Sequence, residues 1–285
     1  MSNSVQHSSI QKITFSGLIV TLGIVYGDIG TSPLYVLKAI IAGGKEINDL
    51  LVLGGISCIF WTLTLQTTVK YVIVTLRADN HGEGGIFALF ALLKKKTPII
   101  IILTMIGGST LLADGVITPA ITVTSAIEGL RINNPNLPVI PIVLIILVIL
   151  FSIQRFGTNV IGKFFGPIML IWFVMLGILG ILQIVDMPHV LLAINPKYAI
   201  KLLIEYPSGI LLLGAVFLAT TGAEALYSDM GHCGIKNIRI SWIFVKTMLI
   251  LTYFGQGAWA LNHPEIARNI NPFYAIMPEL LLVKR

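Results

Sequence analysis

Four acidic side chains stand within, or at the edge of, long apolar stretches of this chain, and they are Asp28, Asp114, Glu128 and Glu224. A charged carboxylate at the centre of a bilayer costs at least a few kcal/mol, so such residues are kept where they face a polar cavity. Oxygen ligands without histidine or thiolate suit hard cations rather than zinc, copper or iron. A few carboxylates combined with carbonyl oxygens suit a large monovalent cation, because carbonyls can replace its hydration shell. These residues therefore predict a monovalent cation site.

Asp28 lies in a segment that cannot form a regular membrane helix, GDIGTSPLY over residues 27–35. Glycine and proline weaken a helix and free backbone carbonyls that lipid cannot satisfy. The helix-breaking residues of this segment are Gly27, Gly30 and Pro33. A helix that is broken around a carboxylate is typical of ion sites in transporters. Tyr35 lies past the break and can return its hydroxyl to the same cavity.

Two further apolar stretches place oxygen atoms on one helix face. Asp114, Thr118 and Thr122 follow one another at intervals of four residues, so they form one stripe. Thr221 and Glu224 are three residues apart and flank the helix-breaking Gly222. An alternative for the threonines of the stripe is a hydrogen bond to the carbonyl four residues back. The predicted cation ligands are therefore Asp28, Tyr35, Asp114, Thr118, Thr122, Thr221 and Glu224.

More acids are present than one monovalent cation needs, and a buried carboxylate can carry a proton. The candidates for proton coupling are Asp28, Asp114, Glu128 and Glu224. Glu128 stands close to Arg131 and can equally be a solvated charge at a helix end. Lys38 and Lys246 are expected to reach the interface or to pair with acids, not to bind substrate. The pattern predicts a proton-coupled cation carrier.

The composition is that of a membrane protein. Hydrophobic residues make up 55% and charged residues 11% of the 285 residues, and the mean hydropathy is +0.90. A soluble domain carries about 25% charged residues. The net charge is +6, and the basic residues lie between the apolar runs. We therefore interpret these residues as a topology signal and not as a nucleic-acid-binding surface. Cys58 and Cys233 form no disulfide or zinc pattern, and no cofactor is expected.

The apolar runs predict seven transmembrane helices, since about 20 residues cross the hydrocarbon core. Basic residues, among them Lys94, Lys95 and Lys96, are concentrated on one side of these runs, which places the N-terminus in the cytoplasm. We expect a multi-pass protein of the cytoplasmic (inner) membrane. The predicted spans are 14–41, 50–76, 98–128, 138–154, 157–184, 207–230 and 238–261.

A short internal sequence similarity suggests how the spans are organised. Asp28 is followed by Leu34-Tyr35, and Glu224 is followed by Leu226-Tyr227. Spans one and six would run in opposite directions, which is the pattern of inverted repeats in transporters. The expected units are a cytoplasmic tail (1–13), a first five-helix repeat (14–184) with a cytoplasmic loop (77–97), an extracytoplasmic connection (185–206), the start of a second repeat (207–261) and an extracytoplasmic tail where an eighth helix would begin (262–285).

Five segments give the chain a resemblance to the KUP/HAK/KT family of potassium uptake permeases. They are GDIGTSPLY (27–35), RADNHGEGG (77–85), LLADGVITPAITVTSAIEGL (111–130), TTGAEALYSDMGHCG (220–234) and NPFYAIMPE (271–279). The resemblance implies a LeuT-like (APC superfamily) fold and potassium uptake by proton symport. It implies that the predicted ligands bind or couple cations, and that Glu128 is a further acid important for uptake.

Family members continue for several helices beyond NPFYAIMPE, so the resemblance suggests a C-terminally truncated member. Three alternatives remain open: a self-sufficient potassium carrier, a half-carrier that needs a separately encoded C-terminal remainder or a second copy, and a non-transporting remnant. An amino-acid carrier is disfavoured, because clustered acids would repel the substrate carboxylate. An intramembrane aspartyl protease would need motifs that this sequence lacks, so we expect no enzyme.

Overall fold

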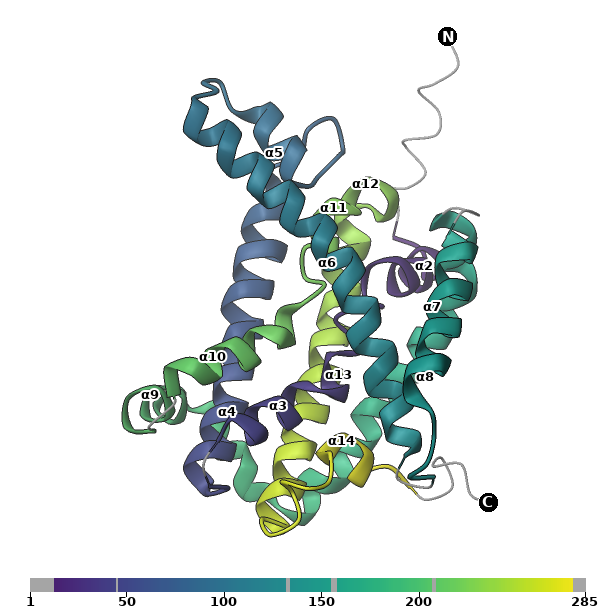
Figure 1. Cartoon of the computed structure of the whole chain (residues 1–285). Coiled ribbons are helices and arrows are strands. Elements are labelled where there is room, and N and C mark those ends of the chain that lie inside the picture. Colours follow the sequence, from purple (N-terminus) through teal and green to yellow (C-terminus); the bar gives the residue numbers. More distant parts are fainter. Residues whose placement is uncertain (1–12, 45, 132–133, 155–157, 207–208, 279–285) are drawn as a thin grey trace.

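The computed structural model describes residues 13–44, 46–131, 134–154, 158–206 and 209–278. Nearly all regular structure in these ranges is helical (Figure 1). The longer helices are α4 (Asp49–Thr62), α6 (Pro98–Leu130), α7 (Val139–Gln154), α8 (Thr158–Asp186) and α13 (Ile235–Asn262). The shorter ones are α2 (Phe15–Val25), α3 (Val36–Gly43), α5 (Ile86–Leu92), α9 (Pro196–Glu205), α10 (Gly209–Phe217), α11 (Ala225–Ser228), α12 (Met230–Cys233) and α14 (Pro272–Ala275).

Several short segments continue or interrupt these helices. A π-helical run, η2 (Leu63–Val74), and a 3-10 turn, η3 (Thr75–Arg77), extend α4. Three further 3-10 segments are η1 (Ser32–Leu34), η4 (Pro188–Ile194) and η5 (Leu218–Thr220). Two helices of the bundle are thus broken: η1 separates α2 from α3, and η5 separates α10 from α11.

The described residues contain five helical segments long and apolar enough to cross a membrane. They are Asp49–Arg77, Pro98–Leu130, Phe164–Asp186, Gly209–Ser228 and Ile235–Asn262. The prediction of seven spans is therefore corrected. The run 14–41 forms two short helical pieces on either side of the break, and the run 138–154 forms α7, an apolar helix of only 16 residues. The predicted N-terminal tail lies almost wholly outside the described residues.

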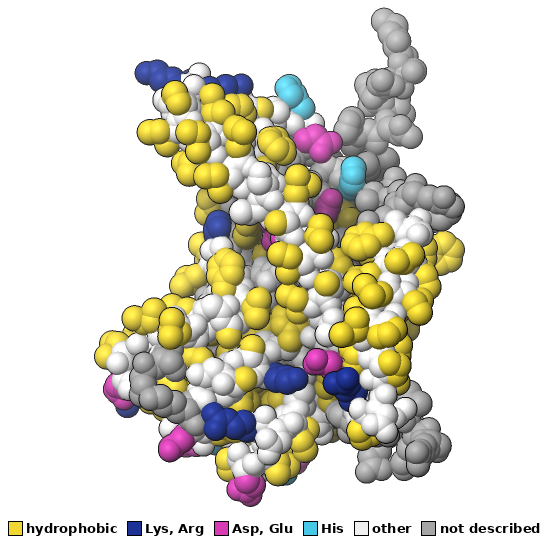
Figure 2. Space-filling model, viewed as in Figure 1, with side chains coloured by type: hydrophobic (Ala, Val, Ile, Leu, Met, Phe, Trp, Pro, Cys, Tyr) yellow, Lys and Arg dark blue, Asp and Glu magenta, His cyan; other side chains and the backbone are white. Residues whose placement is uncertain are grey.

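Helix α13 forms the centre of the bundle and packs along α8 and α2 (Figure 1). Large side chains on α13, such as Trp242, Tyr253 and Phe254, are almost completely buried. Helix α6 lies at the periphery, and only four of its 33 residues are buried. Apolar residues cover much of the molecular surface, as contact with lipid requires (Figure 2).

Two glycines allow α8 and α13 to approach closely. A Cβ atom on Gly180 would lie 2.2 Å from the Leu251 carbonyl oxygen, and one on Gly255 would lie 2.5 Å from the Cα of Gly180. Both contacts are with backbone, which cannot rotate away. A side chain at either position must therefore separate the two central helices.

We predict that Gly180→Ala lowers the stability of the folded protein by about 1–3 kcal/mol, because it overpacks the α8–α13 contact. Gly214→Ala is the matched control, since a Cβ on Gly214 meets nothing within 4 Å. Both changes add the same methyl group to a helix, so their difference isolates the packing. Thermal unfolding of the detergent-purified protein measures it, and equal melting temperatures for the two variants would contradict the prediction.

Candidate cation site

The two helix breaks meet in the middle of the bundle. The first break runs from Tyr26 to Tyr35, between α2 and α3, and includes η1; the second contains Gly222, between η5 and α11. Gly222 has φ +84°, a conformation that suits glycine. A Cβ on Gly222 would lie 2.8 Å from the Cβ of Asp28 and 2.8 Å from the nitrogen of Ile29. Glycine is therefore required here both by the backbone conformation and by the contact between the two breaks.

Three of the four predicted acids come together at this contact. One carboxylate oxygen from each of Asp28, Asp114 and Glu224 lies within 4.8 Å of the other two, and each residue is half-buried. Asp28 Oδ1 is buried and has no hydrogen-bond partner among the described residues. The cluster contains only carboxylates, which is a donor set for hard cations and not for zinc or copper.

Hydroxyl groups surround the acids on two sides. Thr118 donates a hydrogen bond of 2.8 Å to Asp114 Oδ1, so this hydroxyl is oriented by the acid and not by the helix backbone. Thr31 lies 3.3 Å from the Thr122 hydroxyl and donates to the Asp28 carbonyl at 2.8 Å. The Tyr35 hydroxyl is 3.4 Å from the Ser32 hydroxyl. Sequence reasoning missed Thr31 and Ser32, although both stand in the break that it singled out.

Three carbonyls of the first break accept hydrogen bonds from side chains that lie far away in the sequence. Gly30 accepts a hydrogen bond of 2.8 Å from the Trp172 indole, and Pro33 accepts one of 3.2 Å from the Gln256 amide. The Leu34 carbonyl accepts one of 2.7 Å from Asn271. We expected the carbonyls freed by the break to line the cation site. The structure shows that these three accept hydrogen bonds from side chains of α8, α13 and the start of α14.

A cavity of about 530 Å³ reaches the acid cluster from the side that carries α5. Asp114, Thr221 and Glu224 line its inner part. The residues of its wall toward η2 and α5 include Gln66, Lys70, Tyr71, Ile86 and Leu89. Figure 2 shows this side of the molecule hollowed, with basic and acidic side chains visible in the hollow.

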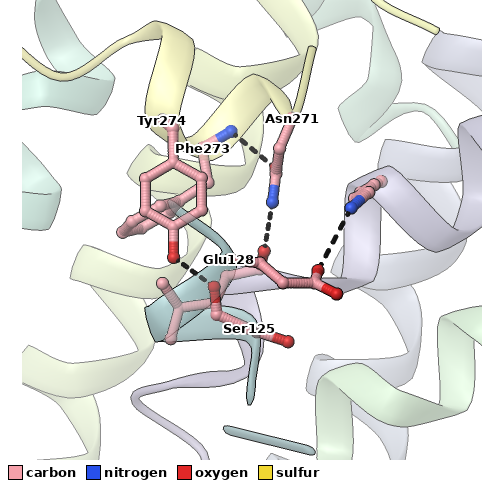
Figure 3. A network of polar contacts seen from close by, with 7 residues as sticks. Ser125, Glu128, Asn271, Phe273 and Tyr274 are labelled. Atoms are coloured by element: carbon pink, nitrogen blue, oxygen red, sulfur yellow. Dashed lines mark hydrogen bonds and ion pairs between the residues drawn. The ribbon is translucent and has the colours of Figure 1, made fainter. Parts of the chain in front are cut away.

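The side that carries α14 is held together by a network of polar contacts (Figure 3). Tyr274 donates a hydrogen bond of 2.6 Å to the Ser125 carbonyl on α6. Lys38 and Glu128 form an ion pair of 3.6 Å, with both side chains about half exposed. Glu128 thus lies in this network, and the group of clustered acids consists of Asp28, Asp114 and Glu224.

The fold and the site together define a polytopic membrane protein with an oxygen-lined site of the kind that suits cations. A family model described as "K+ potassium transporter integral membrane domain" matches residues 15–285. The chain belongs to this family, which confirms the resemblance seen in the sequence. The matches indicate a family of membrane transporters and no enzyme family.

Curated relatives agree with this assignment. The chain is 63% identical over 278 residues to a probable potassium transport system protein Kup of Cytophaga hutchinsonii, covering 96% of this chain and 42% of the relative. It is 62% identical to the protein of that name in Flavobacterium psychrophilum, over 98% of this chain and 44% of the relative. For Streptococcus agalactiae serotype V the identity is 54%, over 96% and 43%. The chain thus spans less than half the length of these relatives.

The comparisons also correct the predicted fold class. They show the K+ potassium transporter family, and no solved structure matches the chain. The predicted LeuT-like (APC superfamily) inverted-repeat fold is therefore without support, and the fold is described as all-helical with five candidate spans among the described residues. The short internal sequence similarity that suggested an inverted repeat comprises an acid, a glycine and a Leu-Tyr pair, which is too little sequence to define a repeat.

We predict that Gly222→Ala weakens cation binding, because the new Cβ displaces Asp28 and is strained at φ +84°. Left-handed strain in a residue other than glycine costs about 1–3 kcal/mol. Gly27→Ala in the neighbouring break is the control, since its Cβ would meet nothing within 4 Å. Titration of the purified variants with rubidium, followed by intrinsic fluorescence, measures the effect. The prediction fails if both variants bind rubidium as the parent does.

Proposed function

We propose that this chain binds potassium between Asp28, Asp114 and Glu224 and takes part in potassium uptake across the cytoplasmic membrane. The observation that supports this is the convergence of the three carboxylates, within 4.8 Å of one another, where two broken helices meet. Membership of the K+ potassium transporter family supports potassium as the cation. Because the chain spans 42–44% of the length of the relatives above, uptake is proposed for the assembled transporter to which it contributes.

The ligands that we propose fit a weakly hydrated monovalent ion. Asp28 Oδ1 is buried without a hydrogen-bond partner in the described structure, and such an oxygen needs a cation or a proton beside it. Thr118 already supports Asp114, and Thr122 and Thr221 place further hydroxyls near the acids. Tyr35 follows the break and faces the same region, so we include it as a ligand or an orienting residue.

We further propose that uptake is coupled to protons. Three carboxylates this close repel one another, and a single potassium ion neutralises only one of them. Protons can neutralise the others, and a carboxylate that exchanges a proton for potassium provides the coupling. Asp28, Asp114 and Glu224 are the proposed carriers. Glu128, which is paired with Lys38, is proposed to act on the α14 side of the site.

The competing function is cation binding without transport, in a remnant or a half-carrier. The fraction of each relative that this chain covers favours considering it. An amino-acid carrier is not favoured, because the three acids would repel a carboxylate substrate. Binding and uptake must therefore be measured separately.

We predict that Asp28→Asn, Asp114→Asn and Glu224→Gln each weaken potassium binding at least tenfold, about 1.4 kcal/mol or more, by removing a charged ligand. Asp186→Asn at the exposed end of α8 is the control and should bind potassium normally. Potassium-induced thermal stabilisation of the purified chain measures binding. Rubidium uptake by cells that lack their own potassium uptake systems measures transport. Normal binding in all three variants would refute the site, while binding without uptake would identify the non-transporting alternative.

We predict that potassium binding weakens as the pH falls, because protons compete with potassium for the same carboxylates. If one proton leaves for each potassium ion bound, the apparent affinity falls by up to about tenfold per pH unit. Potassium titrations of the purified chain between pH 5 and pH 8 measure this dependence. During rubidium uptake the cell interior should acidify. A pH-independent affinity together with an unchanged internal pH would rule out the coupling.

A further inference from the structure

The segment Asn271–Ala275, which comprises Asn271 and α14, connects the two walls of the cation site on the side away from the cavity, and we call it the α14 clamp. Its first contact is made by Asn271. The Oδ1 atom of Asn271 accepts a hydrogen bond of 3.1 Å from the nitrogen of Phe273 and so caps α14. The Nδ2 atom donates one of 2.7 Å to the Leu34 carbonyl in the first break. One amide side chain thus both starts the short helix and holds the break.

The second contact joins Tyr274 of α14 to helix α6. Its hydroxyl donates to the Ser125 carbonyl at 2.6 Å, three residues beyond Thr122. Its ring is seated over Gly129, where a Cβ would lie 2.2 Å from ring carbons. Burial, with the nearby charge of Glu128, raises the pKa of the Tyr274 hydroxyl, so the group remains a donor at neutral pH. The clamp therefore contacts α6 both through a hydrogen bond and through the packing of the Tyr274 ring against Gly129.

The clamp also reaches the break indirectly. Phe273 is buried, and its ring lies 6.0 Å from that of Trp172, which donates to the Gly30 carbonyl. The ion pair between Lys38 and Glu128 joins α3 to α6 in the same region (Figure 3). The break that carries Asp28 and the helix that carries Asp114 are thus connected on this side through the clamp.

The cavity and the clamp lie on opposite sides of the acids. The described residues that line the cavity come from η2, η3, α5, α6, η5, α11 and their neighbours, and none comes from residues 271–275. Figure 1 places α5 and α14 toward opposite ends of the bundle. The cavity thus reaches the acids from the α5 side, and the clamp lies on the other side of them.

We propose that the α14 clamp is the closure of the cation site on the α14 side, and that Asn271 and Tyr274 are positioning residues whose contacts must release before a cation can enter from that side. The inference rests on the proposed function, because it assigns the two sides of a transported cation's path. A few hydrogen bonds of small net strength suit a closure that opens and closes reversibly. The contacts with Leu34 and Ser125 are the ones that must break.

Two substitutions remove contacts of the clamp with the rest of the protein and leave α14 itself folded. Asn271→Asp keeps an acceptor for the Phe273 nitrogen, but it loses the donor to Leu34 and places a carboxylate against a carbonyl. Tyr274→Phe keeps the ring over Gly129 and loses only the bond to Ser125. Asn195→Asp is the matched control, because Asn195 caps α9 in the same way, with Oδ1 accepting from the Lys197 nitrogen at 3.0 Å.

The test measures how a thiol at the site is reached from each side. Thr122→Cys places the reporter beside Thr31, and the native Cys58 and Cys233 are buried. The full chain is inserted into vesicles, and a membrane-impermeant thiol reagent is applied to one side at a time. We expect Asn271→Asp and Tyr274→Phe to raise the labelling rate from the α14 side by about threefold to tenfold, which corresponds to the loss of one hydrogen bond. Labelling in the Asn195→Asp background should match the parent.

Unchanged labelling from the α14 side in both clamp variants would overturn the proposal, as would an equal increase in Asn195→Asp. Labelling of Cys58 would show that a variant has unfolded, and Tyr274→Phe, the milder change, then decides the question. The readout does not require potassium to bind. Failure of the clamp is therefore distinguished from failure of the cation site, which the acid variants test.

Discussion

The structure depends on one constraint, which is that a helix broken inside a membrane must have its freed carbonyls hydrogen-bonded by other parts of the protein. The break between α2 and α3 meets this constraint with three side chains. From α8, α13 and the start of α14, the side chains of Trp172, Gln256 and Asn271 donate to three carbonyls of the break, those of Gly30, Pro33 and Leu34. The central position of α13 and the return of the chain at α14 are both needed to bring these donors into place.

The second break meets the first at Gly222, where the lack of a side chain lets the two backbones touch. Gly222 occupies a conformation and a space that no other residue tolerates beside Asp28. This contact brings Glu224 to Asp28, and α6 adds Asp114 from the other side. The close packing of the two backbones therefore has a direct electrostatic consequence, because it holds carboxylates close together although they repel one another.

Helical spacing and residue type were sufficient to single out the segments that the structure brings together, but they also grouped Glu128 with the three acids of the cluster. They could not predict which atoms the break would use. The donors to Gly30, Pro33 and Leu34 lie 142, 223 and 237 residues away, and nothing in the sequence around Trp172, Gln256 or Asn271 indicates that these side chains donate to the break. Hydropathy also overestimated the number of spans, because it scores an apolar run such as 14–41 alike whether or not the helix continues.

The fate of these carbonyls bears on the proposed chemistry. A site lined by carbonyls is neutral and can bind potassium without any group that titrates. Here the carbonyls of Gly30, Pro33 and Leu34 accept structural hydrogen bonds, which supports the proposal that Asp28, Asp114 and Glu224 balance the charge of the ion. Carboxylates, unlike carbonyls, exchange protons. The hydrogen bonds that stabilise the break are thus consistent with a site in which the acids carry out both the proposed binding of potassium and its proposed coupling to protons.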